Sequence, residues 1–166
     1  HPISVGILDL PGFSCRIHVK DSFAYVACGT SGLHIINVSD PAHPNLAGSY
    51  PSSEITNGVW VNNQYAFATE TRAGLKILDV TNPEAPLLIG SYQTRSEALS
   101  VLVEGDQAFV AQNTLGLLAL DVSNPAAPFE IAAYDTSGKS QSVSREGQYS
   151  SIADLSSVIL LTDDVK

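Results

Sequence analysis

Apolar residues in this chain occur in short runs separated by Gly, Asn, Asp and Pro. Such runs, rich in Val, Ile, Leu and aromatic residues, are typical of short strands joined by tight turns. The run Ala108-Phe109-Val110-Ala111 is apolar at every position, as in a strand covered on both faces. No long window shows the 3.6-residue helical period, so the pattern predicts an all-β protein. Around this run it predicts four strands, at 99–103, 108–112, 117–122 and 130–134.

The same arrangement of strands and turns is repeated along the chain. GLKILDVTNPEAPLLIGSY at 74–92 recurs as GLHIINVSDPAHPNLAGSY at 32–50 and as GLLALDVSNPAAPFEIAAY at 116–134, so successive copies begin 42 residues apart. Periods near 40 residues are typical of propellers and solenoids. The spacing predicts a single β-propeller of four-stranded antiparallel blades over 1–166, or part of one, with about four repeats. These lie at 15–50, 57–92 and 99–134, with a fourth, shared blade at 1–8 plus 142–166.

The two ends of the chain fall inside repeats. The segment from Ile3 to Leu8 aligns with a fourth strand, and the segment from Ile159 to Asp163 aligns with a third. In closed propellers one blade is often completed from both termini, which removes an exposed sheet edge. Three arrangements fit this pattern: a closed four-blade ring, half of an eight-blade dimer, or a piece of a longer propeller. The start at His1-Pro2, without methionine, favours the last.

The recurring turn residues are predicted to specify the fold. Pro83 pre-sets φ for a turn, and Asn82 before it can hydrogen-bond its own backbone. Gly74 permits a positive φ or a close approach of two backbones. A carboxylate also recurs at the end of the third strand, where it could cap a turn or form a calcium-binding ring. The oxygen-rich spacing of a calcium loop is absent, so capping is favoured at these positions: Asn37, Asp79, Asp121 and Asp163.

The motif Gly-Leu-x-Ile-x-Asp-Val-Ser/Thr-Asn-Pro-x-x-Pro, preceded by Ala-Tyr/Phe-Val-Ala, resembles the LVIVD-repeat family. The resemblance covers essentially the whole chain, although the fourth copy, at 158–163, lacks the Gly-Leu start. It implies a β-propeller, mostly in secreted or surface-exposed proteins. The hypothesis adopted here is a secreted, periplasmic or surface setting, or an accessory subunit. It carries no catalytic residues that transfer to this sequence.

Charge and cysteine content narrow the classes of partner. The net charge is −9, from 17 acidic and 8 basic residues, which argues against nucleic acid or an anionic membrane surface. No apolar run approaches the ~20 residues that cross a bilayer. Cys15 and Cys28 lie on opposite arms of a hairpin predicted to turn near Asp21. They are interpreted either as a cross-strand disulfide or as one buried and one partly exposed thiol.

Motifs for catalysis or cofactor binding are missing from the sequence. It contains no phosphate-binding loop, nucleophile elbow or zinc-protease motif. The four histidines lack metal-ligand spacing, so no catalytic residue, cofactor or metal is expected. A channel site would need convergent polar side chains from the first strands of the repeats. Those strands offer mainly apolar residues: Ile17, Val19, Val59, Val61, Val101 and Val103.

Loops that differ between repeats mark a candidate interaction face. Strand alternation places the second-to-third and fourth-to-first connections on one side, at 28–31, 70–73, 112–115, 51–58, 93–97 and 135–141. Variable loops on a rigid scaffold are the usual seat of binding. Trp60, equivalent to His18, Leu102 and Ser144, is either an interface anchor or a filler between blades. The candidate residues are Glu54, Trp60, Glu70, Arg72, Arg95, Glu97 and Lys139.

These observations predict a non-catalytic propeller scaffold that binds a protein partner or joins a larger assembly, including a homo-oligomer. Two alternatives stay open. One is a propeller that binds or hydrolyses a small ligand or glycan in its channel. The other is a structural subunit of an extracellular assembly, built by pairing of edge strands.

Overall fold

The computed structural model describes residues 1–155 and 157–162 and contains only β-strands within those ranges. The strands are β1 (Arg16–Lys20), β2 (Phe23–Ala27), β3 (Leu33–Asn37), β4 (Asn45–Tyr50), β5 (Thr56–Asn62), β6 (Tyr65–Glu70), β7 (Gly74–Asp79), β8 (Leu87–Tyr92), β9 (Ser100–Glu104), β10 (Gln107–Ala111), β11 (Leu117–Asp121), β12 (Phe129–Tyr134), β13 (Ser140–Glu146), β14 (Tyr149–Asp154) and β15 (Ser157–Thr162). They form antiparallel sheets in chain order, β1–β4, β5–β8, β9–β12 and β13–β15. The predicted all-β class is confirmed, and so are the four strands predicted for the third repeat.

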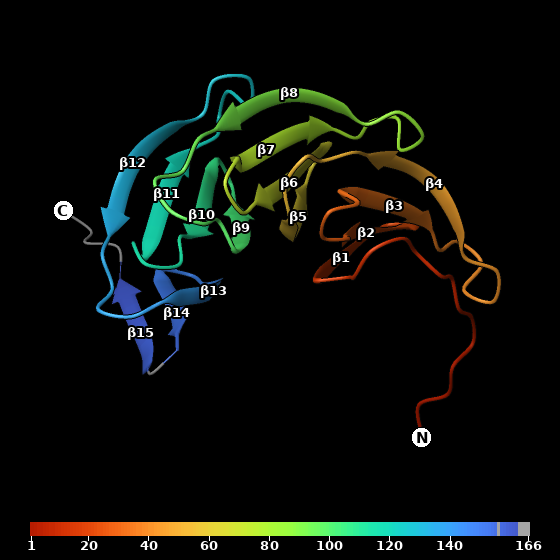
Figure 1. Ribbon diagram of the computed structural model, residues 1–166, viewed down its shortest axis with the longest axis horizontal. Coiled ribbons are helices and arrows are strands. Elements are labelled where there is room, and N and C mark those ends of the chain that lie inside the picture. The colour runs from red at the N-terminus through yellow and green to blue at the C-terminus, as the bar shows by residue number, and fades with distance from the viewer. Residues whose placement is uncertain (156, 163–166) are drawn as a thin grey trace.

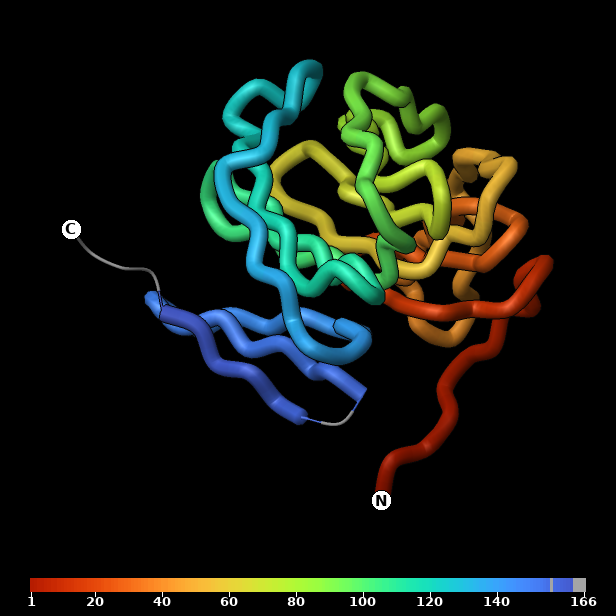
Figure 2. Tube along the Cα trace, turned by 60° about the vertical axis from the view of Figure 1, so that its left-hand side comes forward, coloured from red at the N-terminus to blue at the C-terminus, as the bar shows by residue number. Residues whose placement is uncertain are grey.

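The sheets are blades fanned along an arc (Figure 1). The first strands β1, β5, β9 and β13 are neighbours in series, and the fourth strands β4, β8 and β12 run along the convex side. This is the arrangement of consecutive propeller blades, each packed against the next. Figure 2 shows an open space between the last blade, β13–β15, and the N-terminal segment.

The hydrophobic cores lie between blades. One core joins the face of the second blade carrying Phe67 and Ile77 to the face of the third carrying Val101, Val110 and Leu120. A second core joins the first and second blades in the same way. Because a middle strand faces a neighbouring blade on each side, β6 and β10 are buried over nearly their whole length and apolar along 66–68 and 108–111.

The recurring polar residues cap the turns after the third strands. The Oδ1 atom of Asp79 accepts a hydrogen bond from the Thr81 N–H at 2.8 Å, and Asp121 accepts one from Ser123 at 2.9 Å. Asn82 likewise accepts one from the Glu84 N–H, at 3.2 Å. Hydrogen bonds from the Thr81 and Ser123 side chains, and then these backbone bonds, lower the pKa of the Asp79 and Asp121 carboxyl groups. The capping interpretation is therefore confirmed for these residues, whereas Asp163 lies outside the described residues.

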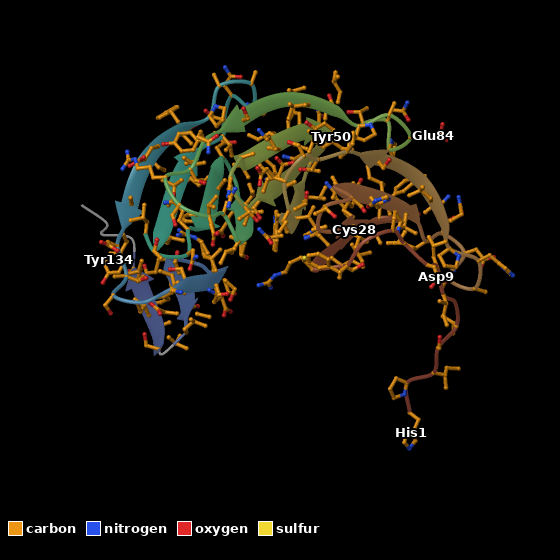
Figure 3. The ribbon with its side chains drawn as sticks, viewed as in Figure 1. His1, Asp9, Cys28, Tyr50, Glu84 and Tyr134 are labelled. Carbon is orange, nitrogen blue, oxygen red and sulfur yellow. The ribbon has the colours of Figure 1, made fainter. Side chains whose placement is uncertain are left out.

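The N-terminal segment differs from its prediction. Residues 1–10 form no strand, and the described part of the chain pairs no strand with the open edge of β15. The predicted strand from Ile3 to Leu8 is therefore wrong for this chain alone, because no sheet edge is beside it to pair with its backbone. His1 lies at the far end of this segment, away from the blades (Figure 3).

The two cysteines are free thiols. Cys15 is exposed and Cys28 is fully buried in the first blade (Figure 3). Burial raises the pKa of the Cys28 thiol, so it is held protonated and unreactive. The structure therefore confirms the interpretation of this pair as one buried and one exposed thiol, and not as a cross-strand disulfide.

A buried arginine attaches the fourth blade to the third. Arg145 of β13 stands where the earlier blades carry Val19, Val61 and Val103. Its side chain is 8 % exposed, its Nε donates to Glu104 at 2.6 Å, and its guanidinium lies 4.6 Å from the centre of the Phe109 ring. An ion pair and a cation–π contact thus join two blades.

Replacing Arg145 with Ala should loosen the fourth blade selectively. The change removes the ion pair with the half-exposed Glu104 and the cation–π contact with Phe109, a loss of about 1–2 kcal/mol. We expect faster hydrogen exchange in β13–β15 and unchanged exchange in β5–β8. Equal acceleration in both blades would contradict this assignment, and Lys139→Ala, on an exposed loop, is the matched control.

Candidate interaction face

The connections predicted to share one side do so. The Gly29 N–H donates to the Thr56 carbonyl at 3.2 Å, and the Thr56 N–H donates back at 2.9 Å. In the same way, the Ser140 N–H at the start of β13 donates to the Asn113 carbonyl, in the loop between β10 and β11, at 2.7 Å. Each second-to-third loop is thus tied to the loop that enters the next blade. We call the surface formed by 28–31, 70–73, 112–115, 51–55, 93–97 and 135–139 the loop face.

Buried polar residues at the ends of the middle strands hold this face in place. Gln112 accepts a hydrogen bond from the Arg95 N–H at 3.2 Å, and Asp154 accepts one from the Lys139 N–H at 2.8 Å. Glu70 occupies the equivalent position and is only 4 % exposed. Its candidacy as a partner-contacting residue therefore finds no support in the structure. The three residues Glu70, Gln112 and Asp154 lie 42 residues apart, and this spacing is the signal in the sequence that indicates their shared supporting role.

Three of the candidate residues meet in one groove. Arg72, Arg95 and Glu97 are exposed and line a cavity of about 350 Å³ between the loops 70–73 and 93–97. The groove floor is fixed by a hydrogen bond from the Thr94 hydroxyl to the Ser96 carbonyl at 2.7 Å. We call this feature the arginine groove. It presents two cations and one carboxylate on a chain that is otherwise strongly acidic.

Arg95 also borders a second cavity, of about 240 Å³, on the third blade. Its guanidinium donates to Glu130 at 3.0 Å while remaining 71 % exposed. The Tyr92 hydroxyl donates to the same carboxylate at 2.9 Å. Burial, followed by this carboxylate, raises the pKa of Tyr92, so the phenol stays a donor at neutral pH. Glu130 was not among the candidates, because nothing in the sequence shows that β12 reaches this loop.

The other candidates lie elsewhere. Glu54 is half-buried on the loop between the first two blades, and Lys139 is exposed on the loop before β13. Trp60 packs against the core clusters on both sides of the third blade, and its ring meets that of His18 edge-to-face with centroids 4.5 Å apart. These contacts favour its interpretation as a filler between blades.

The channel-side strands offer no convergent polar cluster in the described residues. Val59, Val61, Val101 and Val103 are buried between blades. Within the same residues, no group of three His, Cys, Asp or Glu side chains is placed to hold a metal ion. The described chain also has no helix of the length and apolarity needed to cross a membrane.

His18 makes folding pH-dependent. Burial, and then the charge of Lys20, lowers its pKa below the ordinary value near 6.5. The unfolded chain therefore binds the proton first, so this stabilisation is present above pH 6.5 and is lost as the pH falls. Urea unfolding at pH 7.5 and 5.5 should show a smaller acid loss for His18→Leu than for the parent. An equal loss would contradict the assignment, and the exposed His1→Gln is the control.

Comparison with solved structures defines the class of protein as a β-propeller. The fold matches the computationally designed Ika4 protein with a TM-score of 0.78 at 4 % identity, covering 98 % of each chain. The designed Ika8 protein gives 0.73 at 6 %, over 90 % of this chain and 45 % of that one. BamB from Moraxella catarrhalis matches with a TM-score of 0.67 at 17 % identity, covering 89 % of this chain and 44 % of BamB. The chain thus spans a little under half of the last two.

The family is fixed by sequence. The LVIVD repeat model matches residues 11–52, 55–94 and 96–136, which together are most of the chain. The chain therefore belongs to the LVIVD repeat family, as its repeated motif indicated. No curated protein matches the sequence.

Proposed function

We propose that this chain is a non-catalytic β-propeller scaffold that binds a protein partner through its loop face. The observation that carries the proposal is the arginine groove, where Arg72, Arg95 and Glu97 converge on one cavity. Its walls are held by blade-to-blade hydrogen bonds, so the charges are presented by a preorganised surface, which lowers the entropy cost of binding.

The charges indicate what the partner offers. Two exposed arginines favour a segment with acidic side chains, and Glu97 favours a base placed beside them. Glu97 already accepts a hydrogen bond from Asn113 at 2.6 Å, which orients its carboxylate. The chain's net charge of −9 would repel an acidic partner over most of its surface, so approach is favoured at this groove.

The setting we propose is secreted, periplasmic or surface-exposed, or an accessory subunit in such a place. The repeat-family resemblance supports this setting. A catalytic role lacks a supporting site among the described residues, since the first strands of the second and third blades contribute buried valines instead of convergent polar groups.

Site-specific photo-crosslinking in the source organism tests the proposal. A photoreactive residue at Gln93, which lines the groove, should capture a protein that the same residue at Glu84 does not. Glu84 lies at the tip of the β7–β8 turn (Figure 3). The double variant Arg72→Glu/Arg95→Glu should reduce that capture at least tenfold, while Lys20→Glu, remote from the loop face, should leave it unchanged. Capture from Glu84 alone, or capture insensitive to the arginines, would refute the proposal.

A further inference from the structure

The cavity of about 240 Å³ bordered by Arg95 lies where the second and third blades meet the loop face, and we call it the blade pocket. Leu118 of β11 lines it and belongs to the core between these blades, and Tyr92, at the end of β8, lines it and packs against that core. Leu115 and Ala133 extend the apolar lining. The volume is below the ~300–1,000 Å³ of sites for drug-sized ligands, so the pocket fits a single long side chain.

A β-bulge in β12 brings two carboxylates to the blade pocket. The register of β11 against β12 shifts by one residue at Ile131, the extra residue of the bulge. Such a bulge reverses the alternation of side chains along a strand. Glu130, before the bulge, therefore shares a face with Ala133 and Asp135, which follow it, and all three line the pocket.

The charged residues of the blade pocket are specific to this pair of blades. Leu46 and Leu88 stand in the first and second repeats where Glu130 stands in the third, and each pairs with the matching residue of the third strand. Ser53 stands 42 residues before Arg95. The repeated architecture therefore does not require these charges, and residues that vary on a rigid scaffold are the usual seat of recognition.

The ionisable side chains that line the blade pocket leave one carboxylate in excess. Arg95 is already paired with Glu130 at 3.0 Å, and its guanidinium extends toward solvent. Asp135 is exposed and forms no ion pair with any residue in 1–155 or 157–162. An apolar wall beside an unpaired carboxylate matches the side chain of lysine or arginine, whose stem is apolar and whose head is cationic.

A buried amide in the lining offers a further contact. Gln112 is 4 % exposed, and its Oε1 accepts the hydrogen bond from the Arg95 N–H. Its Nε2 donates no hydrogen bond within the described part of the chain. The Gln112 N–H donates to the Gly116 carbonyl at 2.7 Å and the Leu115 N–H to the Gln112 carbonyl at 2.8 Å, which fixes this loop. A buried donor without an acceptor is costly, and a carbonyl of a bound peptide would satisfy it.

We propose that the blade pocket binds a lysine or arginine side chain of the protein segment that occupies the arginine groove. The stem of this side chain packs on Tyr92, its cationic head lies beside Asp135 and Glu130, and Gln112 donates to a carbonyl of the bound backbone. Arg95 lines both cavities, so one segment fills the groove with an acidic residue and the pocket with a basic one. The inference rests on the proposed function, because the ligand is a protein segment on the loop face.

Titration with blocked tripeptides, followed by NMR of the backbone amides, tests the pocket without the natural partner. The probe acetyl-Gly-Arg-Gly-amide should shift the signals of Leu115 and Asp135 saturably, with a Kd on the order of millimolar for one anchored side chain. The citrulline analogue, in which a neutral urea replaces the guanidinium, should bind at least about tenfold more weakly. Equal binding of the two peptides, or no saturable shift with either, would overturn the proposal.

Two substitutions test the charges assigned to the pocket. Asp135→Asn should weaken binding of the arginine peptide about fivefold, whereas Asp106→Asn, the same change on the exposed turn between β9 and β10, should leave it unchanged. Arg95→Gln removes a competing cation from Glu130 and should tighten binding about threefold. An unaltered Kd in Asp135→Asn, or weaker binding in Arg95→Gln, would overturn the assignment.

The same variant separates the blade pocket from the arginine groove. Arg95→Gln should weaken capture of the partner at Gln93 while it tightens binding of the arginine peptide, because the groove loses a cation and the pocket loses a competitor. Capture at Gln93 without any binding of the arginine peptide would overturn the pocket and leave the proposed function standing. Peptide binding that follows the predicted series without capture at Gln93 would support the pocket and refute the groove.

Discussion

Replacing Gly90 with Ala should destabilise the protein by about 3 kcal/mol, the upper end for overpacking a tight contact. A Cβ at this position would lie 1.9 Å from the Pro125 carbonyl oxygen of the next blade. The clash is with backbone, which cannot rotate away, and relief requires the second and third blades to separate. Urea unfolding followed by circular dichroism should therefore show a clear fall in the midpoint.

The chain contains a natural control for this prediction. Gly6, Gly48 and Gly90 each lie against the proline turn of a following blade, whereas the equivalent residue of the third blade is Ala132, which is exposed. Within the described residues no proline turn lies against Ala132. Ala132→Ser should change stability by less than about 0.5 kcal/mol. Equal losses at the two positions would contradict the close-approach argument.

Replacing Ile77 with Ala should cost about 2–5 kcal/mol, the range for deleting a large aliphatic side chain from a packed core. Ile77 is fully buried in the core between the second and third blades. The rigid strands on both sides limit collapse into the cavity, because each is held in its own sheet. The free energy of unfolding, measured in urea, is the readout.

Because Ile77 lies in a core shared by two blades, its loss should affect both blades, and an exposed residue of the same strand pair serves as the control. Leu87→Ala, on the exposed side of β8, removes a similar volume from a side chain that is 64 % exposed, and should cost well under 1 kcal/mol. Hydrogen exchange in Ile77→Ala should accelerate in both β5–β8 and β9–β12, since both blades share the core. Acceleration confined to the second blade would show that blades are stabilised internally, against the arrangement described above.

The fold was largely predictable because local pattern and repeat agree. Fully apolar middle strands such as Ala108–Ala111 indicated blades covered on both faces, and the recurring Asp and Asn residues indicated capped turns. The N-terminal strand was mispredicted because a strand needs a neighbouring edge, and its sequence match to β4 and β8 says nothing about whether that edge is present. The fourth-blade register was also hidden, because Ile152 pairs with Ile159, one residue earlier than the 42-residue repeat indicates from the pairing of Val110 with Leu118.

The loop face was only partly predictable. Loop variation correctly grouped Arg72, Arg95 and Glu97 on one side, because strand alternation fixes which connections lie together. It could not separate Glu70, which is buried under a loop, from the exposed residues beside it. It also missed Glu130 and Arg145, whose roles come from contacts between blades that sequence spacing does not show.

Hydrogen exchange of the chain with and without its captured partner tests the central claim most directly. The account predicts that binding slows exchange in the loops 70–73 and 93–97 around the arginine groove, and leaves the proline turns at 81–86 and 123–128 unchanged. Slower exchange in the proline turns, with the groove loops unaffected, would contradict the assignment of function to the loop face.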